Sequence, residues 1–323
     1  ILTLPSATPI VEKNIFEKRA KDALDLLWEL MDWVDVKAES HCNYIPKPEL
    51  IISYDEASST QLVYLYAEII KKFKSTPFDY FKFKNNEITE QNKERLNLRI
   101  ASLDIGGGTT DLMISTYSVN QNPGSIIELK QNFREGFRSA GDDIVHNVIS
   151  DQIFVQIAKN LAEKNKMQIN ETKQVLRSLF SDDGGVNWTA QKRHQRRLFT
   201  NQVLMPMAYK LLNAYENLDG KTSMETHFDF STLFKDDLPS QEIINFFDEE
   251  VKSSIDECSI RDMKFNVNFD SFNDSIRDVI GKNLEVLSKI IKKYNCDFLL
   301  LTGRPSKYPI IGSILLEGLP VLP

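Results

Sequence analysis

The most informative part of the sequence is Leu103-Asp104-Ile105-Gly106-Gly107-Gly108-Thr109-Thr110-Asp111-Leu112-Met113. An apolar strand leads into Asp104, three glycines turn the chain, and Asp111 opens a returning strand. Because glycine has no Cβ and tolerates positive φ, backbone N–H groups can crowd around an oxyanion at such a turn. Thr109 and Thr110 add hydroxyl donors, and the two carboxylates are hard oxygen ligands for a hydrated magnesium ion. The stretch therefore predicts a polyphosphate–magnesium site.

The spacing of this stretch excludes two other phosphate-binding patterns. It is not G-x-x-x-x-G-K-[ST], and it is not G-x-G-x-x-G, because a strand rather than a helix follows the turn. The alternative is a glycine-rich hairpin that holds no ligand. Three consecutive glycines are costly in a plain hairpin, so the flanking acids and hydroxyls favour the phosphate interpretation.

Apolar periodicity predicts an α/β chain around this turn. We expect helices over 11–34, 57–73, 152–166, 170–180, 202–217 and 272–294, and strands at 1–5, 50–54, 99–102, 111–119, 265–269 and 298–301. In the second helix, Leu62, Tyr66, Ile69 and Ile70 share one side and are expected to be buried. The strand, helix and strand between 265 and 301 predict a right-handed crossover within one sheet.

Composition sets the class of the protein. The chain has 323 residues, which at roughly 150 residues per domain means about two domains. It carries 39 Lys and Arg against 46 Asp and Glu, a net charge of -7, which argues against a nucleic-acid binder. No apolar run approaches the roughly 18 residues of a membrane span. Three scattered cysteines, Cys42, Cys258 and Cys296, indicate no disulfide framework and favour a reducing, cytoplasmic location.

Several motifs in order resemble the actin-like ATPase superfamily, which includes actin, sugar kinases and the DnaK-type chaperones. Asp104–Asp111 is similar to its second phosphate motif. Ile1–Ala7 resembles the strand entering the crossover helix of the first domain, and Asp55–Thr60 the segment that opens the interdomain helix. Glu135–Asp143 resembles the glycine-acid turn after the phosphate hairpin, and Leu300–Pro309 the adenosine motif. The sequences of Asp55–Tyr66 and Thr302–Ser306 are most similar to those of the bacterial SrfB family of virulence factors.

The resemblance implies a fold and a division of the chain. The fold would be an actin-like, ribonuclease-H-like core with a helical inserted subdomain. Residues 1–75 would be the C-terminal part of the first domain, 76–98 a polar surface insertion or linker, and 99–323 the second domain, with 151–261 as the inserted subdomain. The first phosphate motif would precede Ile1, so that the chain looks like a fragment.

The resemblance also implies roles for individual residues. Asp104 and Asp111 would contact Mg²⁺ mainly through water and, with Glu56, would be the catalytic acids. Nucleotide would be bound by the turn, the glycine-acid segment and the adenosine motif: Gly106, Gly107, Gly108, Thr109, Thr110, Gly141, Asp142, Gly303, Arg304 and Ser306. The usual Gly-Gly of the adenosine motif is Thr302-Gly303 here, which leaves the adenine geometry open. In the basic run Lys192–Arg197, a solvated helix face is the default, and a contact to nucleotide is the alternative.

The expected function is an ATP-binding, Mg-dependent ATP-hydrolysing switch linked to bacterial virulence, whose nucleotide state governs a protein partner. Two alternatives stay open: a non-hydrolysing scaffold that keeps the nucleotide fold for protein assembly, and a small-molecule phosphotransferase. No residue evidence supports the base and substrate pocket that a phosphotransferase needs. The partners expected are therefore a nucleotide and proteins, without nucleic acid or a membrane span.

Overall fold

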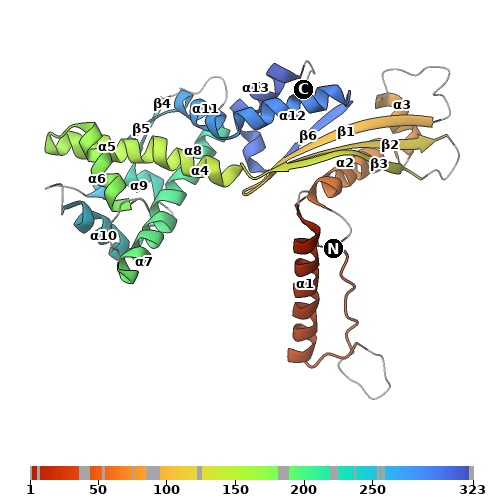
Figure 1. Ribbon diagram of the computed structural model, residues 1–323, viewed down its shortest axis with the longest axis horizontal. Coiled ribbons are helices and arrows are strands. Elements are labelled where there is room, and N and C mark those ends of the chain that lie inside the picture. The colour runs from red at the N-terminus through yellow and green to blue at the C-terminus, as the bar shows by residue number, and fades with distance from the viewer. Residues whose placement is uncertain are drawn as a thin grey trace. The chain divides into compact units, whose positions relative to one another are not determined.

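The computed structural model describes residues 2–5, 8–35, 44–52, 55–74, 76–84, 95–121, 126–180, 189–218, 225–235, 238–252, 255 and 259–319. Within them the protein is mixed α/β, mostly helical, with one four-stranded mixed sheet (Figure 1). The chain divides into two compact units. Unit 1 comprises Ile1–Arg138 and Leu287–Ser306, and unit 2 comprises Ser139–Val286 and Lys307–Pro323.

The sheet of unit 1 is built from β1 (Arg95–Ile105), β2 (Thr110–Asn120), β3 (Glu128–Phe137) and β6 (Phe298–Thr302), in the order β3-β2-β1-β6. The pairs β1–β2 and β2–β3 are antiparallel, and β6 lies parallel to β1. The strands expected at 99–102, 111–119 and 298–301 are confirmed. β3 was not predicted, because its exposed, polar sequence lacks apolar alternation.

Helix α2 (Glu56–Lys72) and helix α3 (Pro77–Lys84) cover one face of this sheet. The core between them is apolar: Leu65, Ile69, Tyr80, Phe81, Leu96, Leu98, Ile100, Tyr117 and Val119. The helix expected at 57–73 is confirmed, but of the four residues predicted on its buried side only Ile69 is buried. The buried residues of α2 are Ala57, Gln61, Leu65 and Ile69, whereas Leu62, Tyr66 and Ile70 are exposed. The helix is rotated because polar contacts, described below, fix Gln61 against the sheet.

Part of the range 76–98, interpreted from sequence as a polar surface insertion, contributes to this core. The aromatic rings of Tyr80 and Phe81 in α3 are fully buried, and Phe73 at the end of α2 packs edge-to-face on Tyr80 with ring centroids 5.3 Å apart. Aromatic pairs of this kind stabilise beyond their buried area. Residues 85–94 lie outside the described part of the chain.

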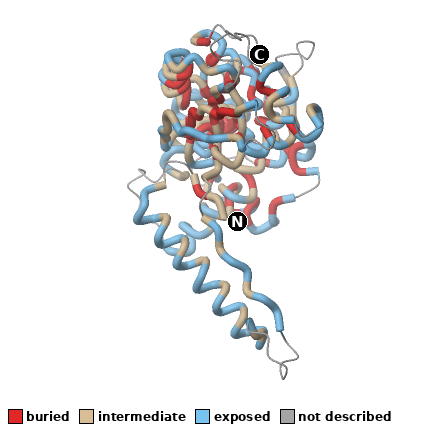
Figure 2. Tube along the Cα trace, turned by 90° about the vertical axis from the view of Figure 1, so that its right-hand side faces the viewer, coloured by how far each residue is buried: buried red, intermediate tan, exposed pale blue. Residues whose placement is uncertain are grey.

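Helix α1 (Ile10–Leu30) confirms the helix expected at 11–34, although it ends at Leu30. No residue of α1 is buried, and Phe16, Leu27 and Leu30 are among its exposed apolar side chains. Figure 2 shows this helix in pale blue and tan along its length. The expected strands at 1–5 and 50–54 reduce, in the described residues, to a bridge between Leu4 and Asp55.

Unit 2 is mainly helical. Its elements begin with α4 (Gly141–Val148), the π-helical turn η2 (Ile149–Ile153), α5 (Phe154–Asn165), α6 (Ile169–Phe180), α7 (Ala190–Phe199), the π-helical turn η3 (Thr200–Leu204) and α8 (Met205–Glu216). There follow β4 (Glu225–Asp229), α9 (Phe230–Leu233), α10 (Gln241–Lys252), η4 (Ile260–Asp262) and β5 (Lys264–Asn268). The helices expected at 152–166, 170–180 and 202–217 are confirmed.

The expected crossover between 265 and 301 was wrong, although its elements exist. α11 (Asp270–Ile276), the π-helical turn η5 (Arg277–Gly281) and α12 (Lys282–Lys293) form the expected helical run. However, β5 pairs antiparallel with β4 in a separate two-stranded sheet, whereas β6 pairs with β1. The alternating burial of β5 fits a half-buried strand in either of the two sheets. Periodicity alone therefore does not identify the strand with which it pairs.

The remaining elements are η6 (Arg304–Lys307) and α13 (Pro309–Gly318). Cys42, Cys258 and the end of the expected strand at Ser53–Tyr54 lie outside the described residues. In the part of the chain that is described, no helix is long and apolar enough to cross a membrane.

Candidate functional site

The two acids of the glycine turn face each other across β1 and β2. In the register of these strands, Asp104 pairs with Asp111, and directly opposed residues project from the same face of a sheet. Asp104 is half-buried, and only 3% of Asp111 is exposed. On the same face, farther down the strands, lie Leu98 and Tyr117, which are opposed in the register and belong to the core below α2. This face therefore changes from apolar to acidic toward the turn.

The turn is closed by a backbone hydrogen bond, and the space around its Gly108 backbone is open. The backbone N–H of Gly106 donates to the carbonyl oxygen of Thr109 at 2.9 Å. None of the three glycines has a positive φ, so the turn does not use the left-handed conformation that glycine permits. A Cβ added at Gly108 would meet no atom within 4 Å. The fold therefore does not itself require glycine at 108, and the backbone there is open to the approach of another molecule.

The two threonines of the motif lie on opposite faces. The Thr109 hydroxyl donates to Oδ2 of Asp111 at 2.8 Å, which orients that carboxylate. Thr110 is fully buried, and because it precedes Asp111 in the strand its side chain projects from the other face. Only the backbone of Thr110 is therefore available to a ligand on the acidic face.

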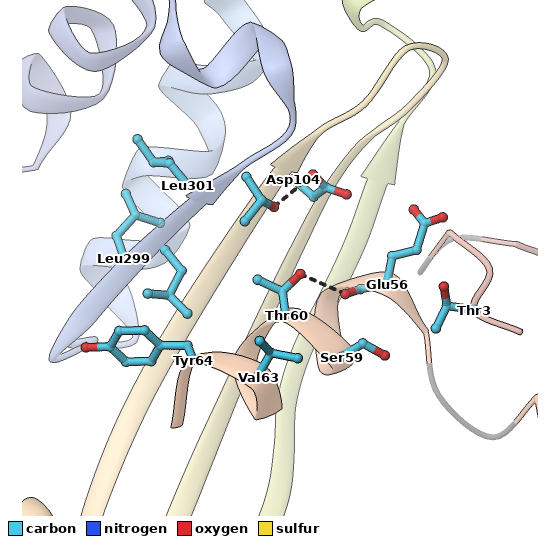
Figure 3. Close-up of a pocket in the computed structure, with 11 residues that line it drawn as sticks. Thr3, Glu56, Ser59, Thr60, Val63, Tyr64, Asp104, Leu299 and Leu301 are labelled. Carbon is cyan, nitrogen blue, oxygen red and sulfur yellow. Dashed lines mark hydrogen bonds between the residues drawn. The ribbon is translucent and has the colours of Figure 1, made fainter. Parts of the chain in front are cut away.

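Glu56, the first residue of α2, reaches the same end of the sheet. Its helix is capped by Asp55, whose Oδ1 accepts from the backbone N–H of Ser58 at 2.7 Å. Burial raises the pKa of Glu56, and the charges of Asp104, Asp111 and Asp55 raise it further. Figure 3 shows the Glu56 side chain extending from the start of α2 toward the end of β1, where Asp104 lies.

Asp104, Asp111 and Glu56 together form an acidic corner at this end of the sheet. The end of β6 completes it. Thr302 is the register partner of Asp104, and its hydroxyl donates to Oδ1 of Asp104 at 2.8 Å (Figure 3). Gly303 follows with a φ of 80°, and a Cβ there would lie 1.9 Å from the carbonyl oxygen of Ile105 and 3.1 Å from Oδ1 of Asp104. The turn at Gly303, which resembles the adenosine motif, thus contacts the glycine hairpin, although almost 200 residues separate the two in the sequence.

The other two residues of the adenosine-like turn have different surroundings. The Ser306 hydroxyl donates to the carbonyl oxygen of Gly303 at 2.7 Å, so it closes its own turn. Arg304 is exposed. The arginine side chain is therefore more accessible than the serine hydroxyl.

A groove of about 700 Å³ begins at this corner and continues between α2 and β6. It is lined by Thr3, Glu56, Ser59, Thr60, Val63, Tyr64, Asp104, Leu299, Leu300, Leu301 and Thr302. Glu56 and Asp104 give one end of the groove its charge, whereas Val63, Tyr64 and Leu299 make the rest largely apolar (Figure 3). Its size falls in the range of small-molecule sites.

The remaining predicted nucleotide residues lie in unit 2. Gly141 and Asp142 open α4, where Gly141 is buried and Asp142 exposed. In the basic run, Lys192 forms an ion pair with Glu250 at 2.7 Å, and Arg196 donates to the carbonyl oxygen of Phe180 at 2.6 Å. At least these two side chains therefore have partners inside unit 2.

Metal ligation rests on few side chains. Among the described residues, no three His, Cys, Asp or Glu side chains are grouped closely enough to hold a metal ion. A magnesium ion often keeps several waters and needs one or two carboxylates besides phosphate oxygens. Asp104 and Asp111 are suitable for that kind of site, and a fully protein-ligated metal site has no support here.

Sequence reasoning missed several residues of the corner. Thr302 was noted only because it replaces the first glycine of the usual Gly-Gly pair. In the structure its hydroxyl donates a hydrogen bond to Asp104. Thr3 and Ser59 line the groove, and Asp55 caps the helix that carries Glu56. Asp55 had a readable signal, because Asp followed by Glu before a helical pattern is a typical helix start.

Comparison with known proteins adds one finding to this geometry. No curated protein matches the sequence. Among protein families, the one described as "Virulence factor SrfB" matches residues 1–323, which is the whole chain. The acidic corner, the glycine turn and the groove are therefore features of a chain that belongs to the SrfB family of bacterial virulence factors.

Proposed function

We propose that this protein binds ATP with Mg²⁺ at the acidic corner of unit 1 and hydrolyses it as a conformational switch. One observation carries the proposal: Asp104 and Asp111 are directly opposed at the ends of β1 and β2 and flank an open glycine turn. Exposed backbone beside paired carboxylates suits a phosphate chain whose charge is bridged by a hydrated cation.

The electrostatics of Glu56 support a cation at this corner. Burial and the neighbouring charges of Asp104 and Asp111 raise its pKa, which means that the acids repel one another at neutral pH. A divalent cation would offset this repulsion. Magnesium held through water by Asp104 and Asp111 would leave Glu56 free to orient a water molecule for attack on the terminal phosphate.

The other residues would bind the rest of the nucleotide. Backbone N–H groups of Gly106, Gly107 and Gly108 would contact the β- and γ-phosphates, with the Thr109 hydroxyl and the Thr110 backbone beside them. Gly303 and Ser306 would border the adenosine, and Arg304 would stack on the base. Gly141 and Asp142 would approach the ribose-phosphate region.

The fold proposed for this function is actin-like. The antiparallel β1–β2–β3 meander, with β6 parallel to β1 on the other side, supports a ribonuclease-H-like core, and the helical unit 2 supports an inserted subdomain. Because a switch requires a ligand with different affinities for two states, ATP and ADP would stabilise different conformations and thereby change the affinity for a protein partner.

Calorimetric titration of the full-length protein with Mg·ATP tests the proposal. Asp104→Asn keeps the shape of the side chain and removes its charge, and we expect the affinity to fall by at least about tenfold, or about 1.4 kcal/mol. The matched control is Asp79→Asn in α3, an exposed acid outside the corner, which should bind like the wild type. If the Asp104→Asn variant and the wild type bind Mg·ATP with equal affinity, the proposed site is contradicted.

A non-hydrolysing scaffold is the second candidate, and the exposed apolar side chains of α1 favour it. Leu26, Leu27 and Leu30, on neighbouring turns of α1, are 55%, 43% and 73% exposed, and exposed apolar clusters commonly mark interaction surfaces. Phosphate release by full-length protein separates the two candidates. Binding of Mg·ATP without turnover, with and without Glu56→Gln, would favour the scaffold.

A further inference from the structure

A row of polar side chains attaches α2 to the sheet beside the buried apolar residues Ala57, Leu65 and Ile69. Asp55, Ser58 and Gln61 recur at intervals of three residues and so share one side of the helix. Gln61 is fully buried, whereas the neighbouring apolar side chains of Leu62 and Tyr66 are 38% and 69% exposed. Gln61 is therefore buried together with Ala57, Leu65 and Ile69 on the side of α2 that faces the sheet, whereas Asp55 and Ser58 are half-buried.

Gln61 is the centre of this attachment. Its side-chain nitrogen Nε2 donates to Oγ of Ser102 at 2.9 Å and lies 3.3 and 3.4 Å from the carbonyl oxygens of Met113 and Ile100. Its Oε1 accepts from the hydroxyl of Tyr117 at 2.9 Å. One side chain thus bridges β1 and β2, and both ends of its amide have partners.

The other two members of the row lie nearer the acidic corner. The Ser58 hydroxyl donates to Sδ of Met113 at 3.3 Å. Asp55 accepts from the backbone N–H of Ser58 through Oδ1, and its Oδ2 lies 3.8 Å from Nη1 of Arg134 on β3. Through these contacts the first turn of α2 is attached to two strands of the sheet, next to Glu56.

Buried polar contacts specify position more strictly than apolar ones. An apolar interface tolerates small shifts and rotations, because dispersion contacts are non-directional. A shift of α2 would instead leave the Gln61 amide and the Tyr117 hydroxyl buried without partners, which is unfavourable. We propose that Asp55, Ser58 and Gln61 are positioning residues that fix α2 in one register on the sheet and so hold Glu56 beside Asp104 and Asp111. This inference rests on the proposed function of that corner.

The test replaces the row's central network by apolar groups of similar shape. In the variant Gln61→Met, Ser102→Ala, Tyr117→Phe, the three side chains that bond one another lose their polar groups together, so the thermal midpoint should stay within a few degrees of the wild type. Hydrolysis of Mg·ATP by full-length protein should fall by at least about tenfold, because a misplacement of about 1 Å can reduce the rate even more. The affinity for Mg·ATP should stay within about twofold, since the phosphate turn is unchanged.

Two controls identify the effect as positioning. Ser118→Ala removes a buried hydroxyl that projects from the opposite face of β2, and its turnover should match the wild type. In a Glu56→Gln background the apolar triple change should cause no further loss of turnover, because the residue that it positions is already absent. A further loss of the same size there would show that the row acts without Glu56 and would overturn the inference.

A second readout does not depend on nucleotide. Burial, together with the charges of Asp104, Asp111 and Asp55, raises the pKa of Glu56, so NMR titration of its carboxyl should show that pKa changing when the triple variant moves the side chain relative to these acids. If wild-type protein neither binds nor hydrolyses ATP, the proposed function fails, and this titration still decides the positioning role. Should the triple variant not fold, Ser58→Ala replaces it: it removes the hydroxyl that donates to Met113 without changing any charge, and the expected loss of turnover is about threefold. Unchanged Glu56 titration in a folded variant overturns the inference.

Discussion

Two glycine turns meet at the acidic corner, and glycine serves a different purpose in each. At Gly303 the φ of 80° and the carbonyl oxygen of Ile105, 1.9 Å from any added Cβ, leave no room for another residue. At Gly108 the φ is not positive, and an added Cβ would meet nothing within 4 Å. The protein's own packing therefore accounts for the first glycine but not for the second.

This difference separates structural from functional glycine. A glycine that the fold requires shows its reason in the neighbouring atoms. A glycine in open space has no such reason inside the chain, and the approach of a ligand to its backbone supplies one. Substitutions at the two turns should therefore have opposite signatures in stability and in binding.

The largest expected effect is that of Gly303→Ala. The new methyl group would overlap the end of β1, and alanine is disfavoured at this φ, so we expect the free energy of unfolding to fall by about 3 kcal/mol. Urea unfolding measures this change. A loss of less than about 1 kcal/mol would mean that β6 can move away from β1, and would contradict the close contact described here.

Gly108→Ala should reverse this signature. The free energy of unfolding should stay within about 1 kcal/mol of the wild type, because the backbone is compatible with alanine. The affinity for Mg·ATP should fall by at least about tenfold, measured by calorimetry. Gly312→Ala in α13 is the matched control, because its Cβ also meets no atom within 4 Å. Equal binding by both variants would make Gly108 a neutral position.

Thr302→Val tests the contact between the two turns. The variant keeps the shape of the side chain but loses the hydroxyl that donates to Asp104, and we expect the free energy of unfolding to fall by about 1 kcal/mol. Thr302→Ser keeps the hydroxyl and should retain most of that stability. If serine and valine lower it equally in urea unfolding, the methyl group rather than the hydrogen bond matters at this position.

The smallest expected effect is that of pH. Because the pKa of Glu56 is raised in the folded protein, its protonated form is favoured by folding, and stability decreases as pH rises from the ordinary glutamate pKa through the raised value. Glu56→Gln removes this loss, so its thermal midpoint should exceed that of the wild type at pH 7 and approach it near pH 4. Added Mg²⁺ should reduce the difference at pH 7. A constant difference across this pH range would contradict the raised pKa.

The sequence predicted the parts of the corner that are local. The strand–turn–strand at 99–119 and the place of its two acids follow from apolar patterning and from three consecutive glycines. The positive φ of Gly303 was not predictable, because it arises from the approach of a distant segment to Ile105. The roles assigned to the site residues as nucleotide contacts stay predictions.

Two errors in the fold have physical reasons of the same kind. Periodicity selected the apolar side of α2, but the partners of Gln61 lie on strands that follow it by about 40 and 56 residues in the chain, and no local pattern reveals them. β5 and β6 were assigned to one sheet because each has a strand pattern, yet pairing is decided by neighbours that a pattern does not identify. Hydrophobic periodicity thus predicts elements better than their partners.

The bond between Thr302 and Asp104 joins residues 198 positions apart, and this separation has a consequence for biosynthesis. The β1–β2–β3 meander consists of neighbours in sequence and can form as soon as it leaves the ribosome. β6 ends 165 residues after β3, so at about 5–20 residues per second it emerges roughly 8–33 s later. During that interval the nascent β1 exposes an unpaired edge, so the newly made chain is expected to be most prone to aggregation, and most dependent on cellular chaperones, before its last strand arrives.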